Sequence, residues 1–469
     1  METNINPSRT QASPDGPDTR AEDEIYRRIA WQLIPLLFLC YIVAYLDRIN
    51  IGVAKLQMLA NLGFSNAVYA FGASIFFWGY VVFEVPSNIL LHKIGARVWI
   101  ARIMISWGIV STGVAFVQPL AALCGITPAA MFYVLRFLLG ACEAGFFPGI
   151  VLYVSYWFPS HRQSQVLGGF LLALPVSTVI GAPLSGWILE SMNGAMNIHG
   201  WQWMFVLEGL PSVLLGVAVL TRLHGGPDSV QWLSPIEKEL VKANLVSGAV
   251  GKRHEFSAAF KDLRIWMMCA IYLAYGTGFY GLAFWLPTII HSAGVKNSFH
   301  VGLLTAIPYA GAAIYMTWHA THARKSDERR LHTALPVLIG GIGLILSAAF
   351  STHMVISLFF MTVAVSGLMS VMTVFWSLPS GFLSGTAVAT GIAVVSSVGS
   401  LSGILGSFVS SIALDLTGDI KSGTYVLGGM MVLSGVLAFL APRSTYGNVV
   451  HAPLAPADTE LELNEVGRQ

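Results

Sequence analysis

Long apolar segments recur along nearly the whole chain and are separated by short polar breaks. A helix needs about 20 mostly apolar residues to cross the hydrocarbon core of a bilayer, and most of these segments reach that length. With Gly, Pro and charged residues taken as boundaries, the pattern predicts twelve membrane-spanning helices. Their predicted ranges are 29–53, 67–91, 98–117, 129–157, 163–189, 201–222, 264–292, 299–323, 331–351, 354–378, 385–414 and 422–441.

A polar segment over residues 223–263 divides these spans into two groups of six. The predicted fold is therefore an all-α membrane protein with two pseudo-symmetric six-helix bundles, at 29–222 and 264–441, with an inter-bundle loop between them. Within that loop a short amphipathic helix is expected over 235–245. The polar stretches 1–28 and 442–469 are predicted to be tails, the first of them disordered. Two such bundles are typical of transporters that bind substrate between them, near the membrane midplane.

Composition supports a location in lipid, because only 11% of the residues are charged and 55% are hydrophobic. The basic residues form no continuous stripe, so no nucleic-acid partner is expected. With the N-terminus in the cytoplasm, 21 of the 26 lysines and arginines fall on the cytoplasmic side. Three, Lys55, Lys296 and Lys421, fall outside. The positive-inside rule then predicts that both termini are cytoplasmic, which requires an even number of spans.

Five charged residues stand out as candidates within the predicted spans of the first half, because an ionised group there costs several kcal/mol and usually has a function. Arg136 and Glu143 are seven residues apart, close to two helical turns, so they share one face of the fourth span. Arg48 lies at a depth similar to that of Arg136. Two guanidinium groups side by side favour an organic carboxylate as substrate. The five residues are Asp47, Arg48, Glu84, Arg136 and Glu143.

Two interpretations of these charges remain open. In the first, the arginines neutralise Asp47 and Glu143 in buried ion pairs that only hold the bundle together. In the second, Asp47 and Glu143 carry coupling protons, and their protonation frees the arginines to bind a substrate anion. Glu84 is weaker evidence for function because it lies near the end of its span, and Glu208 is more simply explained as structural.

The second half has few charges but many aromatic and small residues. Aromatic side chains recur along the seventh span, and Gly and Ser are frequent in the eleventh. Such stripes are usually packing, but some of them can form the apolar wall and the hydroxyl donors of a ligand site. The candidate contacts in this half are Tyr275, Trp376, Ser377, Ser396 and Ser397.

Several motifs together resemble the anion:cation symporter family of the major facilitator superfamily over about residues 30–440. They are YLDRINIG, GYVVFEVPSN, FYVLRFLLGACEAGFFPG, GWQWMFVLEGLP, KSDERRLH and FWSLPSGFLSG. The resemblance implies alternating access and proton-coupled uptake across the bacterial inner membrane, with galactonate, tartrate and phthalate among the family's substrates. It assigns proton coupling and substrate binding to Asp47, Arg48, Arg136 and Glu143, and it adds Tyr45, Tyr80 and Trp376 to the pocket.

The sequence departs from the family's pattern at two places. His92 stands where an acidic residue is usual, which puts the usual gating salt bridge there in doubt. The fifth span reads LLALPVSTV and the eleventh AVVSSVGS, without the amides that contact hydroxyls in sugar-acid carriers. An aromatic carboxylate or a small diacid is therefore favoured over a polyhydroxy acid.

We therefore expect a monomeric, proton-coupled symporter that needs no cofactor besides the proton. An organic-anion exchanger and a galactonate-like symporter are alternatives. An enzyme or receptor is disfavoured because the sequence has no metal-ligand cluster, nucleophile motif or sizeable soluble domain.

Overall fold

The computed structural model describes residues 17–247, 261–326, 328–376, 378–379, 382 and 386–446. Within them, eleven helices are long and apolar enough to cross a membrane. The pair formed by α3 (Ala96–Val114) and α4 (Val117–Cys124) is bent by 89° and can supply the twelfth span. The predicted all-helical fold with about twelve spans is confirmed.

The first half contains the remaining helices up to residue 222. Their bounds are α1 Pro17–Leu62, α2 Asn66–Ile94, α5 Pro128–Glu143, α6 Phe146–Ser155, α7 Ser160–Phe170, α8 Ala173–Ser191 and α9 Gly200–Arg222. The helix expected in the central loop is α10, Pro235–Ser247. The second half contains α12 Leu263–Ser292, α13 Ser298–Ser326, α14 Arg329–Ala349, α15 Met354–Phe375, α16 Thr386–Thr417 and α17 Ile420–Leu440.

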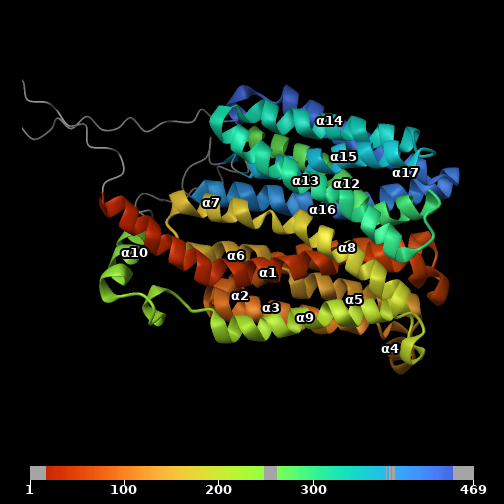
Figure 1. The fold of residues 1–469 in the computed structure, drawn as a ribbon, viewed down its shortest axis with the longest axis horizontal. Coiled ribbons are helices and arrows are strands. Elements are labelled where there is room, and N and C mark those ends of the chain that lie inside the picture. Colours follow the sequence, from red (N-terminus) through yellow and green to blue (C-terminus); the bar gives the residue numbers. More distant parts are fainter. Residues whose placement is uncertain are drawn as a thin grey trace, which may run out of the picture.

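Figure 1 shows the two halves as adjacent layers of nearly parallel helices, α1 to α9 in one and α12 to α17 in the other. Contacts between the layers join α8 to α13, α2 to α16 and α1 to α12. One end of the molecule carries α10 and the beginning of α1, and the opposite end carries α4 (Figure 1). These are called the α10 end and the α4 end below.

The first helix is longer than predicted at both ends. It begins at Pro17, so part of the tail predicted over 1–28 is helical. Contacts with the rest of the chain support these early turns, because Arg28 pairs with Glu237 of α10 and Arg162 lies 2.6 Å from Asp23. Ser234 N–H donates to the Glu237 carboxylate and, together with Arg28, keeps the pKa of Glu237 below its usual value.

The far end of α1 corrects the expected position of Lys55. This residue was assigned to an outer loop, but α1 continues to Leu62 and Lys55 is only 5% exposed. Its apolar stem and neighbours allow the helix to continue beyond the charge, which a hydropathy boundary treats as an end. Lys55 is therefore a further buried charge of the first half.

The predicted span 129–157 is broken into α5 and α6 at Ala144 and Gly145. Gly145 has φ of 87°, a conformation that favours glycine, and a Cβ there would lie 2.3 Å from Ser87 Oγ. The Ser87 hydroxyl donates to the Ala144 carbonyl at 2.6 Å and so satisfies a backbone acceptor at the break. The break leaves Glu143 as the last residue of α5.

Helices α2 and α5 pack closely through glycine. A Cβ on Gly140 would lie 1.9 Å from the Phe76 carbonyl oxygen, and a Cβ on Gly79 would lie 2.1 Å from the Phe137 carbonyl oxygen. Small residues allow helix backbones to approach in a membrane, where packing drives association. This close approach brings the α5 face that carries Arg136 and Glu143 against α2.

Glycine also mediates contacts between the two bundles. A Cβ on Gly302 of α13 would lie 2.2 Å from the Ala182 carbonyl oxygen of α8, and one on Gly186 would lie 2.4 Å from the Ser298 carbonyl oxygen. A Cβ on Gly52 of α1 would similarly lie 2.9 Å from the Phe284 carbonyl oxygen of α12. These close contacts join the bundles on the side of the midplane nearer the α4 end.

Candidate functional site

A cavity of about 550 Å³ lies between the two bundles. It extends from the middle of the molecule towards the α10 end, where His92 of α2 and Ser155 of α6 line it. The first bundle supplies the charged part of the wall, Arg48, Glu84 and Glu143. The second supplies four aromatic side chains and two serines: Tyr272, Phe279, Tyr280, Trp376, Ser396 and Ser400.

Arg48 and Glu143 form an ion pair on the cavity wall. Arg48 Nε lies 2.5 Å from Glu143 Oε1, and the side chains are 22% and 3% exposed. The guanidinium also lies over the rings of Tyr80 and Phe76, at 5.2 and 5.7 Å from their centroids. Arg48 is therefore the more accessible partner of the pair from the cavity.

Arg136 is placed differently from Arg48. It is 1% exposed, its Nε donates to the Gly72 carbonyl oxygen at 3.1 Å, and it does not line the cavity. Its guanidinium lies 5.1 Å from the Phe76 ring centroid, so the two arginines lie near the same ring. One terminal nitrogen of Arg136 has no hydrogen-bond partner among the described residues. The carboxylate clamp of two arginines stays a prediction, with only Arg48 on the wall.

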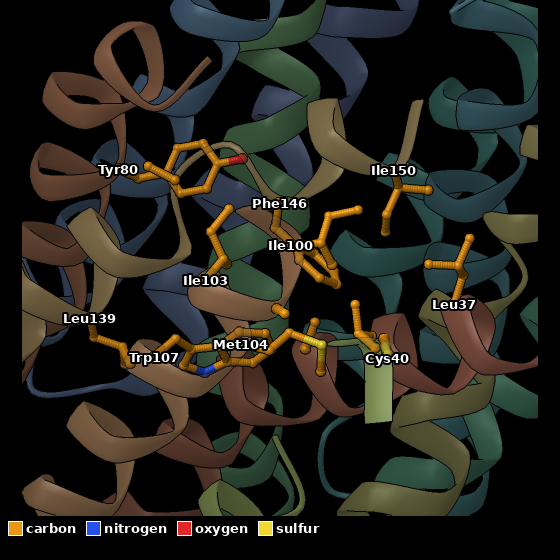
Figure 2. Close-up of a cluster of buried hydrophobic side chains, with 14 of the residues drawn as sticks. Leu37, Cys40, Tyr80, Ile100, Ile103, Met104, Trp107, Leu139, Phe146 and Ile150 are labelled. Carbon is orange, nitrogen blue, oxygen red and sulfur yellow. The ribbon is translucent and has the colours of Figure 1, made fainter. Parts of the chain in front are cut away.

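Asp47 also lies behind the wall, and three neutral groups hydrogen-bond to its carboxylate. Trp107 Nε1–H and Ser111 O–H donate to it from α3, and Asn50 Nδ2 donates at 3.0 Å from one turn along α1. Trp107 is held in an apolar cluster with Met104, Leu139 and Phe146, seen in Figure 2. Within the described residues Asp47 has no salt bridge to either arginine, so the paired arrangement considered from sequence applies to Glu143 alone.

The remaining candidate residues divide between wall and packing. Tyr45, Tyr80, Trp376 and Ser396 line the cavity. Tyr275 does not line it, and its hydroxyl donates to the Leu368 carbonyl oxygen at 2.9 Å. Ser397 is not among the lining residues, and Ser377 lies outside the described residues.

Sequence reasoning undervalued several lining residues. Glu84 lines the cavity, and its Oε2 has no hydrogen-bond partner in the described part of the chain. Its position in an apolar span was the available signal. Tyr272, Phe279 and Tyr280 belong to the aromatic stripe of α12, whose periodicity does not say which members face a cavity. Tyr41 and Asn88, which also line it, carried no distinguishing signal.

Towards the α4 end, aromatic side chains close over Lys55. Its Nζ lies 3.3 Å from the Trp285 ring centroid and 4.8 Å from that of Tyr69. The Tyr69 hydroxyl donates to the Phe284 carbonyl oxygen at 3.4 Å, which links α2 to α12. Lys55 Nζ has no hydrogen-bond partner among the described residues, although the charge of Asp415 on α16 attracts it. A cation–π contact thus joins the two bundles beyond the cavity.

Comparisons with known proteins agree with this architecture. The family model "Major Facilitator Superfamily" matches residues 37–407. NicT of Pseudomonas putida, named as a proposed metabolite transport protein, is 42% identical over 89% of this chain and 94% of its own length. A protein of Agrobacterium vitis, named as a proposed tartrate transporter, is 42% identical over 91% and 96%.

Solved structures show the same fold at much lower identity. The crystal structure of a D-xylose–proton symporter aligns with a TM-score of 0.69 at 15% identity, covering 88% of this chain and 99% of that one. The family match and the high coverage of bacterial relatives confirm the resemblance drawn from the motifs. The chain belongs to the Major Facilitator Superfamily, in its anion:cation symporter-like part, and is a multi-pass membrane transporter.

Proposed function

We propose that this transporter is a symporter that imports a small organic carboxylate together with protons by alternating access. The observation that supports it most is the Arg48–Glu143 ion pair on the cavity wall. An arginine binds carboxylates through a planar fork of N–H donors, so a substrate carboxylate and Glu143 compete for the same group.

The competition supplies a coupling mechanism. When Glu143 takes up a proton on its carboxylate, it loses its negative charge and its hold on Arg48. The freed guanidinium can then bind the substrate carboxylate, and the buried pair of charges is restored with a new anion. When the proton leaves, Glu143 reclaims Arg48 and the substrate is displaced. Proton and substrate therefore bind together and leave together.

The opposite wall favours an aromatic carboxylate or a small diacid. Tyr272, Phe279, Tyr280 and Trp376 provide flat apolar surface opposite Arg48, with hydroxyls at Ser396 and Ser400. Side-chain amides are scarce, with Asn88 the one amide among the lining residues. A polyhydroxy acid would bury more hydroxyls than this wall can satisfy. The name of the Agrobacterium vitis relative, a proposed tartrate transporter, points to a diacid.

Location and orientation form part of the same proposal. The basic residues concentrate at the end where the chain enters α1, so we infer that the α10 end faces the cytoplasm of a bacterial inner membrane. In that orientation the cavity extends towards the cytoplasm, and Lys55 lies on the outer side. The proton is the proposed coupling ion, the substrate is the proposed partner, and the working unit is a monomer.

Uptake into proteoliposomes tests coupling directly. Purified protein is reconstituted, and accumulation of labelled tartrate and labelled phthalate is measured with and without an imposed inward proton gradient. Accumulation that requires the gradient supports symport. If uptake instead requires internal substrate and ignores the gradient, the protein is an exchanger.

The variant Glu143→Gln sharpens this test. Glutamine keeps the size of the side chain but is neutral at every pH, so we expect gradient-driven accumulation to be lost while exchange of labelled for unlabelled substrate persists. Glu239→Gln, at an exposed position on α10, is the matched control and should behave as wild type. Gradient-driven accumulation by Glu143→Gln at the wild-type level would contradict the mechanism.

A further inference from the structure

Glu208 of α9 is a buried acid that the cavity does not use. It is 3% exposed and does not line the cavity. Ser185 of α8 donates its hydroxyl to Oε1 at 2.5 Å, while Oε2 has no hydrogen-bond partner among the described residues. Within the same residues Glu208 forms no salt bridge. An ionised carboxylate in this position would be buried without a counter-charge, which is strongly unfavourable.

Asn50 lies between Glu208 and Asp47. It is fully buried, its Nδ2 donates to Asp47 Oδ1 at 3.0 Å, and its amide also interacts with the Glu208 carboxyl. The Asn50 oxygen, Oδ1, has no hydrogen-bond partner in the described part of the chain. Two buried acceptor oxygens, Glu208 Oε2 and Asn50 Oδ1, are thus left unpaired on neighbouring side chains.

The charged groups around this site come from two helices. Asp47 of α1 repels a charge on Glu208, and on α5 Arg136 attracts Asp47 while Glu143 repels it. The other helices packed here present neutral donors, Trp107 and Ser111 from α3 and Ser185 from α8. Asp47 accepts three hydrogen bonds, whereas Glu208 accepts one from Ser185 and otherwise has only the Asn50 amide that it shares with Asp47. The arrangement therefore stabilises the ionised form of Asp47 better than that of Glu208.

We propose that Asp47 and Glu208 form one proton-binding pair joined by Asn50, and that in the conformation described here the proton lies on Glu208. The Glu208 Oε2–H then donates to Asn50 Oδ1, which pairs both unsatisfied oxygens with a single hydrogen. The role of this pair in energising uptake rests on the proposed symport. Its protonation state does not, because a buried carboxyl group without a counter-charge resists ionisation whatever is transported.

Infrared spectroscopy reports this proton directly, because a protonated carboxylic acid has a carbonyl stretch that the carboxylate lacks. Substrate-free wild type, Glu208→Gln and Asp47→Asn are compared in a detergent without ester groups, over a pH series. Glutamine reproduces a donor at Nε2 and an acceptor at Oε1, so Glu208→Gln should fold and melt near the wild-type temperature. Glu239→Gln serves as the exposed control.

The expected result is a protonated-acid band in wild type and in Glu239→Gln at neutral pH that is missing from Glu208→Gln. In Asp47→Asn the same band should persist but vanish at a pH lower by about one unit, because the repelling charge is gone. If the protonated-acid band is equally strong in wild type and Glu208→Gln, the proton is not on Glu208 and the proposal is wrong. If the pH at which the band disappears is the same in Asp47→Asn as in wild type, Asp47 and Glu208 do not act as one proton-binding pair.

The two proposals fail separately. If tartrate and phthalate uptake ignores the proton gradient while the infrared band behaves as expected, symport is wrong and the proton pair stands. If uptake is proton-driven and the band is absent, the symport stands and Glu208 is only a structural residue.

Discussion

At the scale of single residues, the charged side chains of the first bundle fall into two kinds: those that can change their ion-pair partner and those that are held in place by buried hydrogen bonds. Arg48 and Glu143 form a single ion-pair contact on the cavity wall, so this contact can be replaced by another partner without disturbing the packing of the helices. Arg136 and Asp47 lie behind them, fully buried and held by backbone or neutral donors. This contrast predicts different outcomes for the two arginines.

Arg48→Lys should weaken binding of tartrate or phthalate at least about tenfold, because an ammonium group lacks the planar fork that pairs with a carboxylate. Arg136→Lys is the comparison, since it alters a guanidinium away from the cavity. We expect it to reduce thermal stability more than Arg48→Lys does, because a buried hydrogen bond to Gly72 is lost. Isothermal titration and thermal unfolding separate the two. Equal loss of affinity in both variants would restore the clamp of two arginines.

For Lys55 we expect a substitution to raise the thermal stability and not to lower it. Its buried ammonium has aromatic faces around it but no hydrogen-bond acceptor among the described residues. Lys55→Met keeps the apolar stem and removes the charge, so the melting temperature should rise and transport should slow, because the bundles then separate less readily. A lower melting temperature would mean that the cation–π contact outweighs the cost of burying the charge.

At the scale of helices, the glycines of α2 and α5 determine the positions of the charged side chains on α5. The close approach of α2 and α5 at Gly79 and Gly140 brings the α5 face against α2, and the break at Gly145 ends α5 at Glu143. The site therefore depends on backbone spacing as much as on the charged side chains.

Gly140→Val should destabilise the protein by about 1–3 kcal/mol, or prevent folding, because its Cβ would overlap the Phe76 carbonyl oxygen. Thermal unfolding in detergent measures this. Gly429→Val on α17 is the matched control, since a Cβ there meets nothing within 4 Å. If the two variants melt alike, the α2–α5 spacing is not tightly fixed.

The apolar pattern predicts the helices well because length and hydropathy are local properties, and the cost of charge in lipid singles out Arg48 and Glu143. Other features depend on distant residues. Two of the three donors to Asp47, Trp107 and Ser111, are 60 and 64 residues away on α3, so no spacing rule connects them to it. In the sequence Lys55 looks like a lysine at the membrane surface, because the residue that covers it, Trp285, belongs to the other half of the chain. The break before α6 needed both Gly145 and its neighbour Ser87.

At the scale of the whole molecule, the bundles touch closely towards the α4 end and enclose a cavity towards the α10 end. The α8–α13 contact at Gly302 and Gly186 tolerates no side chain, so it belongs to this arrangement and must open in any state where the cavity faces the other way.

Gly302→Leu should therefore favour separation of α8 and α13. Spin labels at Met196 and Lys296, in a background without the four native cysteines, report that separation by double electron–electron resonance. We expect the distribution to shift to longer distances than in the same labelled protein with Gly302 intact. If the folded variant has the same distance distribution between the two labels, α8 and α13 accommodate the leucine by small local shifts and the bundles do not separate.

The buried Asp, Glu, Lys and Arg side chains among the described residues all lie in the first half, while the second half lines the cavity mainly with rings and hydroxyls. The coupling of transport to protons and the choice of substrate can then be altered independently by mutation. Under the proposed function, exchanging Tyr272, Phe279 or Trp376 for smaller or more polar side chains would change which carboxylate is carried, while the charged half continues to couple uptake to protons. New carriers could thus be made from one unchanged half and a library of the other.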